Sequence, residues 1–339
     1  MKRCIRIILI ILLAFSMPYT YGGCVVVYSS GDIDHEEEKT VDETTGGFIG
    51  VASQAAITPM NAEALTLGAL AGAPTSVAPK SVKLNHRPKD AQIDVFRPLR
   101  LPLVLKNSLD HIKINPAVLI FNRKDVTTQS DNSAGTCGGD FLYSLNLNRI
   151  TQKFSGSIVF NDYCDDGVII SGAAEVAGTF KIRTGNFETA TFSFEDLSVD
   201  ATTIDGEMSI DFSDSPIFAT FTADSKNEPN GPIYRMKDYS INLFQYAGHV
   251  AIEIFGTFYH PQEGFVTLTT SEPFVVFDED DWPSSGQLAI RGDSDTAAQL
   301  IAIDQRHYRI EADTEGDKIF DKDLGILNWP DWEIRGTRF

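Results

Sequence analysis

The chain has 339 residues, of which 42% are hydrophobic, enough to bury one large core or two small ones. Charged residues make up only 22%, so the composition excludes a coiled coil and a disordered chain. Acidic residues outnumber basic ones by 47 to 28, which gives a formal net charge of −19 at pH 7. Because such a charge repels the phosphate backbone, no nucleic acid is expected as a partner.

The N-terminus has the pattern of an export signal. Three basic residues at positions 2, 3 and 6 are followed by the apolar run 7–15, which is too short to span a bilayer as a mature helix. This order of a basic start and a short apolar run is typical of a signal peptide. The sequence therefore predicts that residues 1–23 are a signal peptide.

The residues around the predicted cleavage site resemble the bacterial lipobox. Residues 21–24 read Tyr-Gly-Gly-Cys, with small residues before a cysteine that is acylated in lipoproteins. On this resemblance Cys24 is the lipidation site, and the partner is a membrane reached through a lipid anchor. Val25 is not the Asp of a retention signal, so the outer membrane is the expected location. Tyr21 departs from the aliphatic residue usual there, and the alternative is a periplasmic or secreted protein.

The cysteine count supports export. Cys4 leaves with the signal peptide and Cys24 carries the lipid, which leaves Cys137 and Cys164. An even remainder in an oxidising compartment indicates one disulfide. A metal site is the alternative, but the sequence has no CxxC and no histidine close to either cysteine.

Residues 24–95 are predicted to be a flexible tether. The segment 32–43 is acidic and polar, and the segment 46–79 is rich in Ala, Gly, Thr, Ser and Pro, a composition that buries little. A short helix is expected at 61–70, where Asn61 can act as the N-cap. The alternative is that part of this stretch packs onto the domain that follows.

Residues 96–339 are predicted to be an all-β domain. Apolar and polar residues alternate from residue 141 onward, most clearly in the runs 141–148, 154–161 and 308–313. Since no helix pattern of useful length separates these runs, we expect antiparallel pairing. A dozen or more strands in an up-and-down meander require a barrel, a strongly curved sheet or a two-sheet sandwich.

Residues 96–121 form a transition into this domain. Four leucines alternate between Leu99 and Leu105, which predicts a strand, and three prolines exclude a long helix. The later runs are separated by turn signals at 165–167, 184–186, 230–232, 262–264 and 291–293. The last signal, Arg-Gly-Asp, matches the integrin-binding tripeptide, but it is interpreted as a hairpin tip.

Two cysteine-containing segments resemble a group of uncharacterised Gram-negative β-rich lipoproteins. These segments are Cys-Gly-Gly at 137–139 and Asn-Asp-Tyr-Cys-Asp-Asp-Gly at 161–167. The resemblance extends over about residues 137–321, where similar proteins also carry an acidic stretch like 313–321. It implies an exported β-rich protein with this cysteine pair, and it implies no particular activity.

The acidic stretch 313–321 is the best candidate for a metal site. Its carboxylates recur at alternate positions, which is how calcium loops supply oxygen ligands to one ion. Lys318 stands where such loops need glycine, and the alternative is an exposed acidic turn. A second acidic run, 278–281, is expected to be a solvated loop. The candidate ligands of Ca2+, the one cofactor considered, are Asp313, Glu315, Asp317 and Asp321.

The sequence gives little support to catalysis. None of the six histidines belongs to an HExxH motif, and neither a GxSxG nor a GxxxxGK[ST] motif is present. His249 and His260 fall at strand positions and are expected to be structural. The tryptophans at 282, 329 and 332 are expected to close one end of the domain, with sugar or partner binding as the alternative.

These features predict a non-enzymatic cell-envelope lipoprotein that presents its β domain to a protein or glycan, or supports the envelope. Two alternatives stay open. One is a periplasmic or secreted carbohydrate-active hydrolase with paired carboxylates. The other is a secreted adhesin stiffened by calcium.

Overall fold

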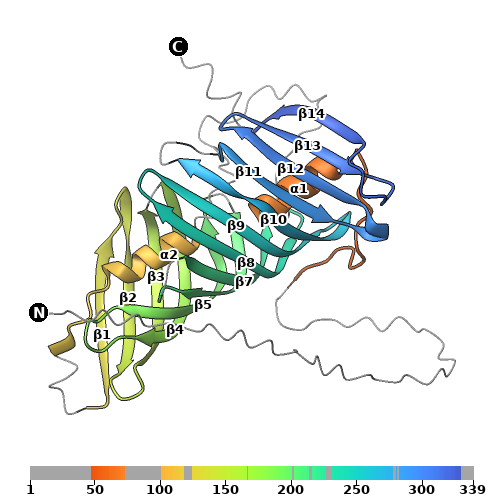
Figure 1. Ribbon diagram of the computed structural model, residues 1–339. Coiled ribbons are helices and arrows are strands. Elements are labelled where there is room, and N and C mark those ends of the chain that lie inside the picture. Colours follow the sequence, from red (N-terminus) through yellow and green to blue (C-terminus); the bar gives the residue numbers. More distant parts are fainter. Residues whose placement is uncertain are drawn as a thin grey trace, which may run out of the picture. The chain divides into compact units, whose positions relative to one another are not determined.

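The described residues form one open antiparallel sheet. The computed structural model describes residues 47–72, 101–117, 124–165, 167–200, 202–213, 216–226, 231–277, 280 and 282–329. Within them fourteen strands pair in sequence order, each with its neighbours along the chain (Figure 1). The predicted antiparallel meander is confirmed. Because β1 and β14 stay unpaired with each other and all strands belong to one sheet, the described part is neither a closed barrel nor a sandwich.

The strands cover most of the chain from residue 126 to residue 328. They are β1 (Val126–Ala134), β2 (Gly138–Asn148), β3 (Lys153–Asp165), β4 (Val168–Phe180), β5 (Phe187–Val199), β6 (Thr202–Asp211), β7 (Ile217–Lys226), β8 (Tyr234–Tyr246), β9 (His249–His260), β10 (Gly264–Phe277), β11 (Ser285–Arg291), β12 (Ala297–Asp304), β13 (His307–Asp313) and β14 (Lys322–Asn328). The described residues also contain two helices, α1 (Ala62–Ala71) and α2 (Leu101–His111), and one 3-10 turn, η2 (Asp293–Asp295). The described residues of each predicted turn signal lie at or next to a connection between two consecutive strands.

One face of the sheet is apolar and buried. In β2 the alternate residues Phe141, Tyr143, Leu145 and Leu147 are at most 7% exposed, while their neighbours point to solvent. The predicted runs in β3 and β13 show the same alternation, and β6 shows it as well. Successive side chains on a strand point to opposite faces, so this pattern gives the sheet one inward and one outward face.

Helix α1 lies against the inward face of β9–β13. The hydroxyl of Tyr239 donates to the carbonyl of Ala69 at 2.7 Å, and the hydroxyl of Tyr308 donates to Glu63 at 2.7 Å. The predicted helix at 61–70 is confirmed with a shift of one residue. Asn61 does not cap it, because its side-chain oxygen accepts the N–H of Thr58 instead.

Residues 47–72 therefore pack against the sheet. This agrees with the alternative given above, in which part of the predicted tether packs onto the β domain. The backbone N–H of Ala55 donates to Phe265 at 2.8 Å, which adds this segment to β10. The prediction of a tether through residue 95 is wrong for this segment. Its alanines and glycines carry little apolar surface each, but small residues let α1 approach the sheet closely, and most of the helix is buried. The rest of the predicted tether lies outside the described residues.

Helix α2 replaces the strand predicted from the leucines at 99–105. Its buried side chains follow helical spacing and face β5 and β6. Pro102 lies in the first turn, where a helix has no internal partner for its missing N–H, so the proline is tolerated. Leucines four or eight residues apart share one face of a helix. The strand prediction considered only the period of two and therefore overlooked this helical spacing. The buried residues are Leu101, Pro102, Val104, Leu105, Ser108 and Leu109.

The tryptophans close one end of the core. Trp282 and Trp329 stack with ring centroids 4.7 Å apart and planes 5° from parallel, and both are at most 5% exposed. Tyr308 packs on Trp329 at 4.6 Å. The indole N–H of Trp329 donates to the carbonyl of Asp304 at 2.9 Å. The structural role predicted for these two residues is confirmed, and Trp332 lies outside the described residues.

Candidate binding surface

The predicted disulfide between Cys137 and Cys164 is present, with Cα atoms 5.1 Å apart. It joins the residue before β2 to the end of β3. Asp165, the next residue, is 4% exposed and accepts the Thr136 hydroxyl at 2.7 Å and the Asn107 amide at 2.8 Å. Because Asn107 belongs to α2, this carboxylate ties the helix to the disulfide hairpin and is structural.

Cys24, the predicted lipidation site, and the predicted signal peptide lie outside the described residues. In the part of the chain that the structure describes, no helix has the length and apolarity needed to cross a membrane.

The acidic stretch 313–321 does not gather its carboxylates. The side chain of Asp313 accepts the backbone N–H groups of Lys318, Gly316 and Glu315 at 2.7, 2.8 and 3.2 Å. Burial raises the pKa of Asp313, but these N–H groups outweigh it and hold the pKa below its ordinary value.

Over the described ranges, no three His, Cys, Asp or Glu side chains lie together as a metal ion needs. The prediction that Asp313, Glu315, Asp317 and Asp321 form one Ca2+ site is therefore not supported by their positions. The spacing of the carboxylates suggested metal ligands, but the Asp313 carboxylate accepts hydrogen bonds from backbone N–H groups of its own turn.

The other motifs also occupy turns. The Arg-Gly-Asp tripeptide connects β11 to β12, and the N–H of Asp293 donates to the carbonyl of Ala55 at 2.7 Å, so this turn helps to hold the N-terminal segment. Of the acidic run 278–281 only Asp280 is described, and it accepts the hydroxyl of Ser284 at 3.0 Å.

Each described histidine contacts a side chain or backbone group close to it in the fold. His260 accepts two backbone N–H groups at Nδ1, from Gln262 and Glu263, each at 3.3 Å. His249 stacks on the ring of Tyr246. The remaining two, His111 and His307, lie within hydrogen-bonding distance of Tyr163 and Asp304.

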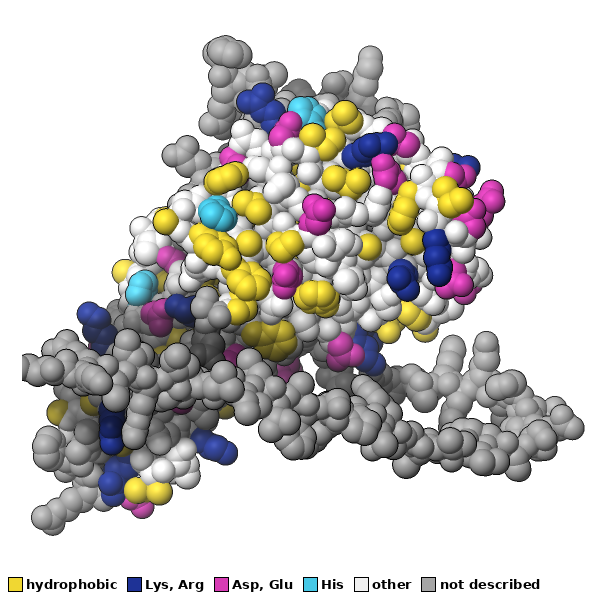
Figure 2. All heavy atoms as spheres, in the orientation of Figure 1, with side chains coloured by type: hydrophobic (Ala, Val, Ile, Leu, Met, Phe, Trp, Pro, Cys, Tyr) yellow, Lys and Arg dark blue, Asp and Glu magenta, His cyan; other side chains and the backbone are white. Residues whose placement is uncertain are grey.

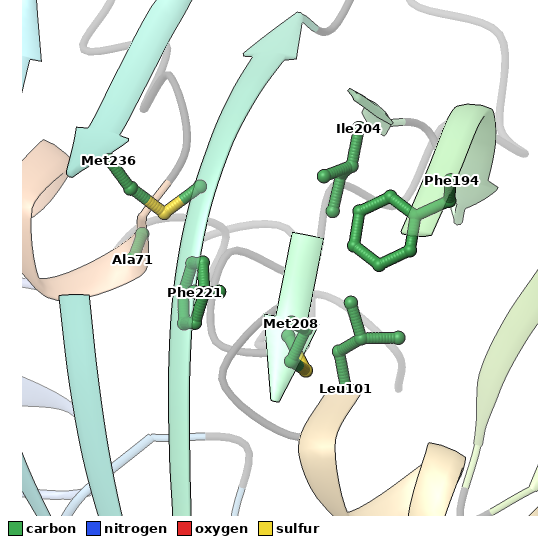
Figure 3. A pocket seen from close by; sticks show the side chains of 7 residues that line it. All are labelled: Ala71, Leu101, Phe194, Ile204, Met208, Phe221 and Met236. Atoms are coloured by element: carbon green, nitrogen blue, oxygen red, sulfur yellow. The ribbon is translucent and has the colours of Figure 1, made fainter. Parts of the chain in front are cut away.

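A small cavity lies on the inward face between α1 and α2 (Figure 3). Figure 3 shows its lining side chains pointing toward one another, and all of them are apolar. The space of about 10 Å³ matches one water molecule, and it offers no polar partner to hold one. The cavity is therefore a packing gap in the core. It is lined by Ala71, Leu101, Phe194, Ile204, Met208, Phe221 and Met236.

Across β1–β6 the outward face of the sheet is largely polar, although Leu142 of β2 and its register partner Val159 of β3 are exposed there. Hydroxyl and amide side chains pair from strand to strand, each contact lying between 2.8 and 3.0 Å. Such pairs satisfy one another and leave a hydrated surface. The pairs are Thr128–Asn146, Ser130–Ser144, Thr179–Thr189 and Thr191–Ser209.

Beside the turn between β8 and β9, one end of the outward face of β7–β10 carries aromatic side chains. Tyr246, His249 and Phe277 are register partners in one row, and Phe244, Ala251 and Val275 form the next row. Phe218 of β7 lies in a third row, beside Asn242. We call these seven apolar or aromatic residues the aromatic patch: Phe218, Phe244, Tyr246, His249, Ala251, Val275 and Phe277.

The aromatic patch is accessible. Tyr246, Phe277 and Phe218 are 56%, 48% and 44% exposed. Figure 2 shows hydrophobic side chains gathered on the outward face where Figure 1 draws β8, β9 and β10. The sequence motifs considered above did not predict this surface. Phe244 and Tyr246, two aromatic residues at alternate positions just before a Gly-containing turn, could have indicated it.

Comparisons of the chain with protein-family models, with curated proteins and with solved structures found no match.

Proposed function

We propose that the protein is exported, carries a lipid on Cys24 that anchors it in the outer membrane, and presents its β domain for binding without catalysis. The observation that carries this proposal is the disulfide between Cys137 and Cys164. Disulfides form and persist in oxidising compartments, which supports a location outside the cytoplasm. The basic and apolar N-terminus and the small residues before Cys24 agree with that location.

The sheet itself favours a binding role. Its strands form one continuous hydrogen-bonded surface whose outward face is free of the two helices. A rigid surface held by backbone hydrogen bonds keeps its exposed side chains in fixed positions, which lowers the entropy cost of binding. A bacterial lipoprotein carries several acyl chains, and more than one chain is needed for stable anchoring.

Metabolic labelling with radioactive palmitate tests the anchor. We expect label in the wild-type chain and none in Cys24→Ala. Cys4→Ala is the matched control, because Cys4 leaves with the signal peptide, and it should label like the wild type. Fractionation should place the wild type with the outer membrane. A wild-type chain without label would overturn the anchored form and support a secreted one.

A further inference from the structure

The aromatic patch differs from the rest of the outward face. Three large side chains at one end of the sheet are 44% to 56% exposed: Tyr246 and Phe277 in the first row and Phe218 in the third. On β1–β6 many outward positions pair through hydroxyl and amide groups, and the exposed apolar pair Leu142–Val159 contains no aromatic ring. Scattered apolar side chains are normal on a surface, but a contiguous group of aromatic ones marks an interaction site.

The charges around the aromatic patch favour a cationic partner. Asp211 pairs in register with Phe218, and Glu253 pairs in register with Asn242 of the same row. The three rows, including these border residues, contain no Lys or Arg. A second copy of the chain would bring a further large net negative charge, so electrostatics oppose self-association.

The ring geometry selects among ligand classes. The rings of Tyr246 and His249 lie 4.8 Å apart and 16° from parallel, so each covers a face of the other. Phe277 tilts against His249 at 5.8 Å. The stack covers one face of each ring, so at most one face of each is left for a sugar ring, whereas apolar side chains of a polypeptide pack against ring edges as well as faces.

We propose that the aromatic patch binds a cationic amphipathic polypeptide segment. Apolar side chains of that segment pack on Tyr246 and Phe277, and its Lys or Arg side chains lie toward Glu253 and Asp211. This inference rests on the binding role proposed above and names its surface and the chemistry of its partner. It does not depend on the lipid at Cys24.

Short synthetic peptides test the proposal on the full chain. The probes are a fluorescent peptide of alternating Lys and Leu, one of alternating Glu and Leu, and one of alternating Lys and Ser. We expect the Lys-Leu peptide to bind at least about tenfold more tightly than the other two, because it alone satisfies both the apolar and the charged part of the surface.

Matched variants locate the binding. Tyr246→Ser combined with Phe277→Ser should weaken the Lys-Leu peptide about tenfold or more. The control combines Leu142→Ser with Val159→Ser, two register partners on the outward face that are 48% and 40% exposed, and should leave binding unchanged. Glu253→Gln should weaken binding several-fold, mostly at low salt. Thermal unfolding of every variant checks that the fold is kept.

Four outcomes would overturn the proposal. The first is equal binding by the wild type and the Tyr246/Phe277 variant, and the second is preference for the Glu-Leu peptide. The third is wild-type self-association in sedimentation that this variant loses, which assigns the surface to a second copy. The fourth is partition into phosphatidylcholine vesicles that the same variant loses. Palmitate labelling changes in none of these cases, so this proposal and the anchor fail separately.

Discussion

His260, at the end of β9, is held in its neutral form. Its Nδ1 atom accepts the backbone N–H groups of Gln262 and Glu263, which is possible only while that nitrogen carries no proton. Burial lowers the pKa of His260, and the charge of Glu263 offsets part of this effect. The ring also meets Tyr234 edge-on at 5.2 Å, so the turn after β9 is built around a neutral imidazole.

The stability of the fold should therefore depend on pH through His260. The unfolded chain takes up a proton near the ordinary pKa of 6.5, before the folded chain does. This contribution is fully present above that value and is lost as pH falls toward the lower folded pKa. In urea unfolding between about pH 7 and pH 5, His260→Gln should show a shallower fall in the free energy of unfolding than the wild type. Identical pH slopes would show that His260 does not contribute.

At the residue scale, the number of cysteines was enough to predict the disulfide. Contacts that depend on the backbone conformation of a turn could not be predicted from the sequence. Cys137 and Cys164 could be paired because the other two cysteines were assigned to the predicted signal peptide and the predicted lipid anchor. The metal prediction at Asp313 gains no support, because its oxygens accept N–H groups of its own turn, and a sequence pattern cannot distinguish such a turn from a ligand loop.

Gly68 sets how closely α1 approaches the sheet. A Cβ atom added there would lie 2.7 Å from Cζ of Phe258, a fully buried ring of β9. Glycine within a helix costs about 1 kcal/mol relative to alanine, so its presence here needs a packing reason. The aromatic ring of Phe258 fills the space that any other residue at 68 would need.

Gly68→Ala should consequently destabilise the protein although it improves helix propensity. Overpacking a rigid core costs about 1–3 kcal/mol, which exceeds the propensity gain at the upper end of that range. Phe258→Leu should lose stability by itself, and the double variant should be more stable than the sum of the two single effects predicts. Urea unfolding of all four chains measures this coupling. A Gly68→Ala protein more stable than the wild type would contradict the tight contact.

At the element scale, strand positions could be predicted but the helices only in part. Alternating apolar and polar residues indicate a strand because one face of the sheet is buried and the other is exposed to solvent. The burial patterns of β2, β3 and β13 follow this alternation. Helix α2 was misread because leucines at every second position also place some of them on one helical face. Helix α1 was placed, but its burial was missed because its small residues give no strong apolar stripe. Its packing depends on partners such as Phe258, about 190 residues away along the chain.

The two edges of the sheet decide that the fold stays open. β1 pairs with β2 along all of its nine residues without a bulge, yet none of its side chains is buried. Its inward positions carry Thr127, Gln129, Asp131 and Ser133, so the apolar core ends at β2. Closure of the meander could not be predicted from the strand runs, because it depends on whether the first and last strands pair with each other. An inward-pointing carboxylate such as Asp131 also discourages pairing with other chains.

This difference between edge and centre predicts an order of hydrogen exchange. Opening β1 breaks backbone hydrogen bonds but exposes no core, whereas opening β4 or β5 exposes Ile170, Val176 and Phe192, each at most 2% exposed. The other edge, β14, packs Leu324 and Leu327 against the core and should be intermediate. In exchange followed by mass spectrometry, we expect peptides of β1 to exchange first, those of β14 next and those of β4 and β5 last. If β1 exchanged as slowly as β4, its stability would come from a contact beyond the ladder with β2, and the open edge described here would be covered in solution.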